Sequence, residues 1–219
     1  MKSKPNIVTI VLILFTQLGA MAQYTSNDWE ERDKWMKLSK VYELAGIEKG
    51  NVVADVGCHE GYLSLRLSKR VGEDGKVYAV DVREDRLETL RKHLEKQEFK
   101  NVEVVLGAYD NPKLPDKSLD VVIVMDTYHE MDDYMKILAH IKKALKPNGR
   151  ILILEKLKQH MKSKDRSQQA DAHTLSLKYV KSELEEAGFS VTKEVKDFGV
   201  WNKEKNKRMW VLVAVPLDI

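Results

Sequence analysis

The sequence has almost no cysteine, and its charges of opposite sign nearly cancel. The single cysteine, Cys58, cannot form a disulfide within the chain, so we expect a fold held together without one. The six histidines show no close ligand spacing to Cys58 or to one another, so the sequence predicts no metal site. With 37 basic and 34 acidic side chains, the formal charge of +3 gives no indication of nucleic-acid binding. Internal repeats and low-complexity segments are also lacking, and 219 residues suffice for one domain with a sizeable core.

The N-terminal segment differs in composition from the rest of the chain. It has a short basic start, an almost wholly apolar run over residues 7–15, and an A-x-A-like cleavage site at Ala20-Met21-Ala22. These are the three parts of a secretory signal peptide, and the apolar run is too short for a comfortable membrane span. We therefore expect residues 1–22 to be removed on export to the periplasm or the medium, leaving a domain over 23–219 without a stable membrane span. An uncleaved anchor is the alternative, and a chain without a working signal would be cytoplasmic.

The stretch VVADVGCHEG at residues 52–61 organises the rest of the chain. An apolar run leads into Asp55, and a loop marked by Gly57 and Gly61 follows. Leu63 and Leu67 come next at helical spacing, so the stretch predicts a buried strand, a tight turn and a helix. Such a junction places helix N–H groups beside a ligand, and glycine lets the backbone approach that ligand closely. The weaker alternative is that Asp55 only caps the turn and the glycines only form it.

A second predicted strand, residues 76–81, ends in Asp81, which is placed to accept hydrogen bonds from ribose hydroxyls. A cofactor containing a nucleoside is therefore expected, either a nicotinamide dinucleotide or S-adenosylmethionine. The dinucleotide fingerprint G-x-G-x-x-G needs three glycines, and only Gly57 and Gly61 fall in the window. Asp81 also has a competing role, because residues 81–84 fit a capping box for the helix that follows.

The segment Asp55-Val56-Gly57-Cys58-His59-Glu60-Gly61 resembles the D-x-G-x-G-x-G motif of class I S-adenosylmethionine-dependent methyltransferases, with His59 in place of the central glycine. The resemblance continues through Asp81, residues 120–126 and residues 144–153. It covers about residues 51–153 well, and it extends to ubiquinone and menaquinone C-methyltransferases. Four motifs in the right order at the right spacing make this resemblance specific.

The resemblance implies an α/β fold, with a Rossmann-like, seven-stranded, mostly parallel sheet, helices on both faces and a C-terminal antiparallel hairpin. It also implies S-adenosylmethionine as the cofactor. Family members often carry an acidic residue after the third strand for the adenine amino group; Ala108 stands there, so its backbone or Asp110 would make that contact. The cofactor-binding residues that we expect are Asp55, Gly57, Cys58, His59, Gly61, Asp81, Val82, Ala108, Tyr109 and Asp126.

Hydrophobic patterning predicts the remaining elements. It indicates a helix over residues 27–45, with Trp29 and Trp35 as packing residues rather than ligand contacts. The family resemblance implies that this helix lies beside the cofactor cleft. Residues 156–172 are polar and charged, and they predict a mobile connection or a lid. The other expected elements are strands over 102–106, 119–125 and 150–155, helices over 132–145 and 176–187 with Ser176 as N-cap, and hairpin strands over 189–198 and 208–215.

Three residues after the fourth strand are the candidates for catalysis. Asp126 could bind the methionine ammonium of the cofactor or orient a neighbour, and the ring of Tyr128 could form a wall of the pocket. His129 has an ordinary pKa of about 6.5, so it can accept a proton from an acceptor near neutral pH. The alternative is structural: Tyr128 and His129 pack the loop against the next helix, and Asp126 or Asp132 caps that helix.

Two functions follow from these observations. The first is S-adenosylmethionine-dependent methyl transfer to a small-molecule acceptor, which the intact acidic and glycine positions favour. The second is a non-catalytic protein of the cell envelope on the same nucleoside-binding fold, which the export signal favours because the cofactor is made in the cytoplasm. The sequence alone specifies neither the acceptor nor the atom that is methylated.

Overall fold

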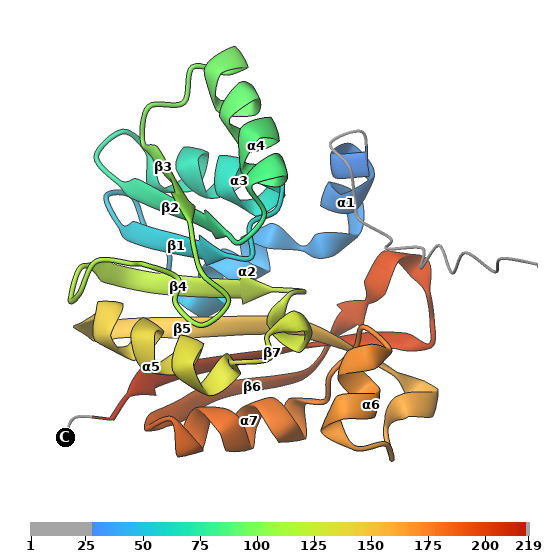
Figure 1. The fold of residues 1–219 in the computed structure, drawn as a ribbon. Helices are drawn as coiled ribbons and strands as arrows, with labels where there is room; N and C mark the ends of the chain where they lie inside the picture. Colours follow the sequence, from blue (N-terminus) through green and yellow to red (C-terminus); the bar gives the residue numbers. More distant parts are fainter. Residues whose placement is uncertain (1–27, 218–219) are drawn as a thin grey trace, which may run out of the picture.

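The computed structural model describes residues 28–217, so the predicted signal peptide at residues 1–22 lies outside the described residues. Seven strands form one sheet in the order β3-β2-β1-β4-β5-β7-β6 (Figure 1). Strands β1 to β5 are parallel, and β7 runs antiparallel to both β5 and β6. The strands are β1 (Val52–Val56), β2 (Lys76–Asp81), β3 (Val102–Leu106), β4 (Leu119–Met125), β5 (Leu145–Lys158), β6 (Phe189–Val200) and β7 (Lys207–Pro216). The mostly parallel sheet with a C-terminal antiparallel hairpin confirms the predicted fold class.

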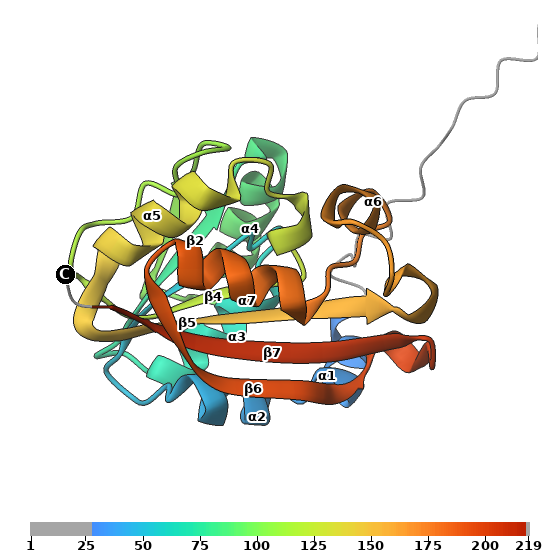
Figure 2. The ribbon, with the colours of Figure 1, turned by 90° about the horizontal axis from the view of Figure 1, so that it is seen from below.

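Helices cover both faces of the sheet. Side chains from α1, α2, α3 and α4 pack with one face, and those from α5 and α7 pack with the other. Figure 2 shows α5 and α7 on one side of the strands and α1 and α2 on the opposite side. The helices are α1 (Trp29–Met36), α2 (Leu38–Ala45), α3 (Tyr62–Val71), α4 (Glu84–Lys96), α5 (Tyr134–Ala144), α6 (Arg166–Asp171) and α7 (Leu177–Glu186), with the short 3-10 turns η2 (Tyr128–Glu130), η3 (Gln159–Met161) and η4 (Trp201–Lys203).

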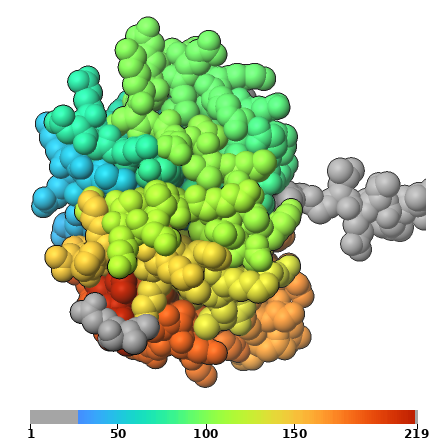
Figure 3. Space-filling view, turned by 60° about the vertical axis from the view of Figure 1, so that its left-hand side comes forward, coloured from blue at the N-terminus to red at the C-terminus, as the bar shows by residue number. Residues whose placement is uncertain are grey.

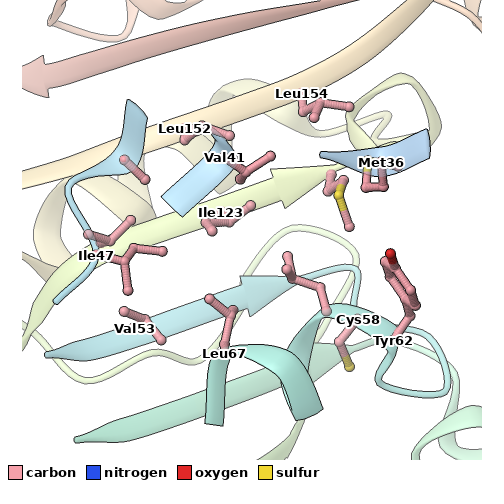
Figure 4. Packing of buried hydrophobic residues seen from close by; sticks show 14 of the residues in the cluster. Met36, Val41, Ile47, Val53, Cys58, Tyr62, Leu67, Ile123, Leu152 and Leu154 are labelled. Atoms are coloured by element: carbon pink, nitrogen blue, oxygen red, sulfur yellow. The ribbon is translucent and has the colours of Figure 1, made fainter. Parts of the chain in front are cut away.

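Strand β4 shows why the central strands are largely apolar. Its side chains alternate between the two faces: Ile123 belongs to the core under α2 and α3, whereas Val122 and Val124 belong to the core under α5. A parallel strand between two helical layers has no face in water, so every residue of β4 except Asp120 near its start is apolar. Figure 4 shows Ile123 between Val53 and Leu152 of the neighbouring strands, in the core that Val41 of α2 also joins.

The structure corrects the predicted helix over residues 27–45 within its described part. Two helices, α1 and α2, stand there, because Lys37 between them has a left-handed backbone with φ of +54°. The ammonium of Lys37 donates a hydrogen bond to the carbonyl of Phe198 in β6, at 2.9 Å. A contact with a strand 161 residues away therefore fixes the break, and no local pattern could indicate it.

Residues 156–172, predicted as a mobile connection or a lid, contain a strand end and two short helices that the sequence analysis did not expect. Strand β5 continues to Lys158, where it still pairs with β7, and η3 and α6 follow. Ser176 stands at the predicted N-cap of α7, but its side chain makes no capping hydrogen bond, and the helix ends at Glu186. Lys156, Lys158 and Arg166 of this segment lie on β5 and α6, although a polar composition does not indicate such elements.

The strand order reverses direction between β1 and β4, and ligands of open α/β sheets bind beyond the carboxyl ends of the strands at such a point. Figure 3 brings forward the side of the molecule at the left of Figure 1, where the blue and green half of the chain lies above the yellow and orange half.

Within residues 28–217, none of the helices combines the length and the apolar composition that crossing a bilayer would need.

Candidate active site

A cavity of about 350 Å³ opens at the carboxyl ends of the parallel strands. Its wall combines the loops that follow β1, β2, β3 and β4 with part of α1. This volume lies at the lower end of the range for small-molecule sites. The lining includes the predicted residues Asp55, Gly57, Cys58, His59, Asp81, Val82, Ala108, Tyr109 and Asp126. The structure therefore brings nine predicted residues from four separate loops to one cavity, while Gly61 begins α3 behind it.

The loop after β1 needs glycine at position 57. The φ of Gly57 is +82°, and a Cβ atom there would lie 2.2 Å from Cγ2 of Thr127 in the loop after β4. The N–H groups of Gly57 and Cys58 both donate to the carbonyl of Val80, at 2.8 and 3.0 Å, which ties the loop to β2. The Cys58 side chain is buried, and burial raises the pKa of its thiol, in keeping with a small residue that fills the loop.

His59 stands where the motif has its central glycine, and it adopts the conformation that glycine would. Its φ is +51°, in the left-handed region that costs a residue with a side chain about 1–2 kcal/mol. The backbone N–H of His59 donates to Oδ2 of Asp81 at 2.8 Å, which holds the loop in this shape. The substitution therefore keeps the loop geometry of the motif.

Asp81 links the loops after β1 and β2. Its Oδ2 accepts the N–H of His59, and its Oδ1 accepts the N–H of Arg83 at 3.0 Å. The capping-box alternative is wrong in detail, since α4 begins at Glu84 with Arg83 as its N-cap. A carboxylate has about four lone-pair positions, so two remain for a ligand in the cavity.

Asp55 is almost completely buried at the base of the cavity. The hydroxyl of Ser64 on α3 donates to its Oδ2 at 2.6 Å. Burial disfavours the ionised form and raises the pKa of this carboxyl from 3.8 to about 7, and the Ser64 hydrogen bond only partly offsets the effect. A cationic group of a ligand beside Asp55 would restore the charge that burial opposes.

Helix α1 supplies a wall that sequence reasoning largely missed. Trp29 packs edge to face on Tyr62, with ring centroids 6.1 Å apart, and both line the cavity. Trp29 is thus both a packing residue, as predicted, and part of the cavity wall. Arg32 also lines the cavity, with its guanidinium carbon 4.3 Å from the centroid of the Tyr62 ring. No motif in the sequence marks Arg32, because it lies on α1, outside the loops that carry the motifs.

The loop after β3 offers fewer free hydrogen-bonding groups to an adenine base than the sequence predicts. The N–H of Ala108 donates to the carbonyl of Asn111 at 2.7 Å, and its own carbonyl accepts the N–H of Asn111 at 3.1 Å. The backbone donor of Ala108 is therefore engaged, and only a second lone pair of its carbonyl remains. Asp110 is absent from the cavity wall, whereas the exposed ring of Tyr109 stands at its rim.

The residues after β4 are divided between the cavity and the core. Asp126 lines the cavity with a left-handed φ of +59°, and its carboxylate accepts a hydrogen bond from the ammonium of Lys156. Tyr128 is fully buried in the core under α5, so the structure does not place its ring in the wall of the cavity. Burial raises the pKa of the Tyr128 hydroxyl far above its usual value.

His129 is also buried and does not line the cavity, so its role as a base stays a prediction. Its Nδ1 lies 2.8 Å from Oε1 of the buried Glu155 on β5. Burial acts to lower the pKa of His129, but the Glu155 carboxylate outweighs it and raises that pKa above its usual value. The neighbouring Glu130, not singled out from the sequence, does line the cavity.

Comparison with known proteins agrees with this geometry. Residues 47–210 match a family model described as a methyltransferase domain. The demethylmenaquinone methyltransferase of Bacillus mycoides is 28% identical over 127 residues, which are 58% of this chain and 53% of the relative. That of Listeria welshimeri is 29% identical over 122 residues, 56% of this chain and 51% of the relative. The chain therefore spans about half the length of the curated relatives it matches.

Solved structures share the whole fold. A SAM dependent methyltransferase from Aquifex aeolicus has a TM-score of 0.71 and 27% identity, covering 88% of this chain and 98% of its own. The [4+2]-cyclase SpnF has a TM-score of 0.68 and 16% identity, covering 82% of this chain and 80% of its own, which shows a common fold alone. Because one fold serves more than one reaction, the site has to carry the functional argument.

Proposed function

Because the chain belongs to the methyltransferase domain family, we propose that it transfers the methyl group of S-adenosylmethionine to a small-molecule acceptor. The observation that carries the proposal is the cavity itself. Asp55, Asp81 and Asp126, from the ends of three parallel strands, meet there around a loop shaped by Gly57. S-adenosylmethionine, the cofactor of this family, supplies when bound a methyl group already activated by a positively charged sulfur.

The residues present fit this cofactor. Asp81 keeps two acceptor positions beyond the backbone N–H groups that it already binds, enough for the two hydroxyls of a ribose. The loop from Gly57 to His59 is held by β2 and by Asp81, so it presents its backbone to a ligand without first having to order. Preorganisation of this kind lowers the entropic cost of binding.

The cationic end of the cofactor matches the acidic base of the cavity. Within residues 28–217, Asp55 accepts a hydrogen bond from the hydroxyl of Ser64 and none from a cationic side chain, although the positive charge of Arg32 acts to lower its pKa. Asp126 is already ion-paired with Lys156, so Asp55 is the better candidate to face an ammonium group. Of the two roles predicted for Asp126, binding the methionine ammonium or orienting a neighbour, the second then applies.

Catalysis in this proposal rests chiefly on alignment and on exclusion of water. A direct methyl displacement needs the acceptor atom held in line with the methyl carbon, and a partly enclosed cavity with apolar and polar walls can provide this. The side chains of Met125, Met131 and Ile137 give the wall near β4 its apolar part. A base is needed only where the acceptor must lose a proton, and His129 remains the candidate from the sequence.

The curated relatives named as demethylmenaquinone methyltransferases support a small organic acceptor. The alternative is a cell-envelope protein that binds a nucleoside without catalysis. The predicted export signal favours that alternative, because S-adenosylmethionine is made in the cytoplasm.

Calorimetry on the full chain separates these functions. Binding of S-adenosylmethionine and of its demethylated product, without binding of NAD, is the expected result. Incubation with labelled S-adenosylmethionine and a panel of small metabolites, quinones included, then tests for methyl transfer. Failure to bind either S-adenosylmethionine or its demethylated product would refute the proposal. Binding without methyl transfer to any member of the metabolite panel would favour the non-catalytic alternative.

A further inference from the structure

Three side chains of residue types that commonly bind metals, two histidines and a glutamate, lie close together beside the cavity, where η2 meets the loop between α6 and α7. Nε2 of His129 lies 3.8 Å from Oε1 of Glu130, and Nδ1 of His173 lies 3.9 Å from the same oxygen. One ligand atom from each residue lies within 4.8 Å of the other two. We propose that His129, Glu130 and His173 bind a divalent transition-metal ion, and that Zn²⁺ fits the site best.

The hydrogen bond between the His129 ring and Glu155 prepares His129 as a metal ligand. Nδ1 of His129 lies 2.8 Å from Oε1 of Glu155, and with the Nδ1 proton donated to that carboxylate, a metal ion can displace the proton on Nε2 and bind its lone pair on the side facing Glu130. Glu155 is fully buried, and it also accepts the backbone N–H groups of His129 and Lys156, each at 3.2 Å. A carboxylate that orients a histidine in this way is the usual outer partner of a metal-binding imidazole.

The loop that carries His173 is fastened to the same strand. The hydroxyl of Thr174 donates to the carbonyl of Lys156 at 2.7 Å, and the N–H of Leu175 donates to that carbonyl at 2.9 Å. Consecutive residues of β5 thus act on both histidines: the side chain of Glu155 orients His129, and the carbonyl of Lys156 holds the loop that carries His173. Figure 2 shows α6, which precedes His173, beside the end of β5.

The local charges favour a cation. Three carboxylates, Glu130, Glu155 and Asp126, lie around His129, against the one ammonium of Lys156. Asp126, His129 and Glu155 form a second possible ligand set. Its members already satisfy one another through the His129–Glu155 hydrogen bond and the Asp126–Lys156 ion pair, so that set has no room for an ion.

The distances suit a site that closes slightly on its ion. Zinc bonds of about 2.0–2.1 Å in tetrahedral geometry place neighbouring ligand atoms about 3.3 Å apart, about half an ångström less than the two distances observed. The side chains of Glu130 and His173 are 54% and 55% exposed, so both can rotate to close this gap. His129 is locked by Glu155 and would be the fixed ligand.

Three protein ligands leave a fourth position open, as in catalytic zinc sites. Because Glu130 lines the cavity, that position borders the place where an acceptor would bind. An acceptor with an oxygen, nitrogen or sulfur donor would be oriented by the metal, which would also make its proton more acidic. This last step rests on the proposed function, whereas the metal site itself does not.

Titration of the full chain with Co²⁺, followed by displacement with Zn²⁺, tests the site, using protein prepared without a polyhistidine tag. Four-coordinate Co²⁺ absorbs visible light more strongly than octahedral Co²⁺, so the spectrum also reports the ligand number. We expect one ion per chain. His173→Ala and Glu130→Gln, which change surface side chains, should each weaken binding at least about tenfold. His160→Ala removes an exposed histidine of η3 and is the matched control, with affinity unchanged.

No binding, equal affinity in wild type and both variants, or an equal loss in His160→Ala would overturn the metal site. Calorimetry with S-adenosylmethionine on the same samples keeps the two proposals apart. Loss of Co²⁺ binding in His173→Ala with cofactor affinity retained supports the site. Absent metal binding with normal cofactor binding refutes the site alone, and the reverse result refutes the proposed function alone.

Discussion

Asp55 gives a prediction about how cofactor affinity depends on pH. Burial raises its pKa from 3.8 to about 7 in the protein without ligand, and it lines the cavity. A cationic ligand beside it stabilises the ionised carboxylate, so binding must lower this pKa and release a proton. If only the ionised form binds tightly, about 10% of molecules are competent at about pH 6 and about 90% at about pH 8. The affinity for S-adenosylmethionine should then rise about tenfold over that range.

Calorimetry in two buffers of different ionisation enthalpy measures the released proton directly, with about half a proton expected per site at about pH 7. Asp55→Asn is the control, because its amide oxygen still accepts the Ser64 hydroxyl but does not titrate. The amino group of the ligand titrates near the usual α-amino pKa of about 7.7–8.0, and comparison with the variant removes that contribution. The same pH slope and proton release in both proteins would refute the reasoning.

The stability of the protein without ligand should change with pH in the opposite direction to the cofactor affinity, falling as Asp55 ionises. A carboxyl whose folded pKa lies above its unfolded value binds its proton more tightly in the native state. Its contribution to the free energy of unfolding is therefore greatest below about pH 4, falls as the pH rises toward about 7, and is constant above that. Asp55→Asn should flatten this part of the stability curve, which denaturant titration at several pH values would measure.

Three further predictions concern other parts of the chain. Asp81→Ala should weaken cofactor binding by about 1.5–3 kcal/mol, the usual value of hydrogen bonds to a charged group, and equal affinity by calorimetry would exclude the ribose role. Gly57→Ala should lower the free energy of unfolding more than Gly50→Ala does. Both glycines have φ of +82°, but only the first would meet a neighbour, Thr127, so equal losses in denaturant titration would contradict the close approach. Export predicts a mature chain cleaved after Ala22, and mass spectrometry that finds the uncleaved chain in the cytosol of its host would contradict it.

The parallel part of the sheet was predictable because its strands are apolar along their length and end at marked residues. The predicted bounds of 76–81, 102–106 and 119–125 coincide with β2, β3 and β4. The break at Lys37 was not predictable, because the cause lies in β6, where the carbonyl of Phe198 binds the lysine ammonium. The extension of β5 into the segment 156–172 was not predictable for a similar reason, since residues 156–158 pair with β7 and their composition does not indicate that pairing.

The sequence by itself determined which residues follow the ends of the parallel strands and therefore lie at one edge of the sheet. An acidic residue next to a glycine loop, as at Asp55 and Gly57, is a local pattern, and local backbone preferences suffice to position it. Only the tertiary structure decided what those side chains and their neighbours do. Burial sets the pKa of Asp55, Lys156 occupies the carboxylate of Asp126, and Glu155 turns the ring of His129 toward His173. These effects depend on solvent exclusion and on charges brought together from distant parts of the chain, and no short sequence pattern encodes either.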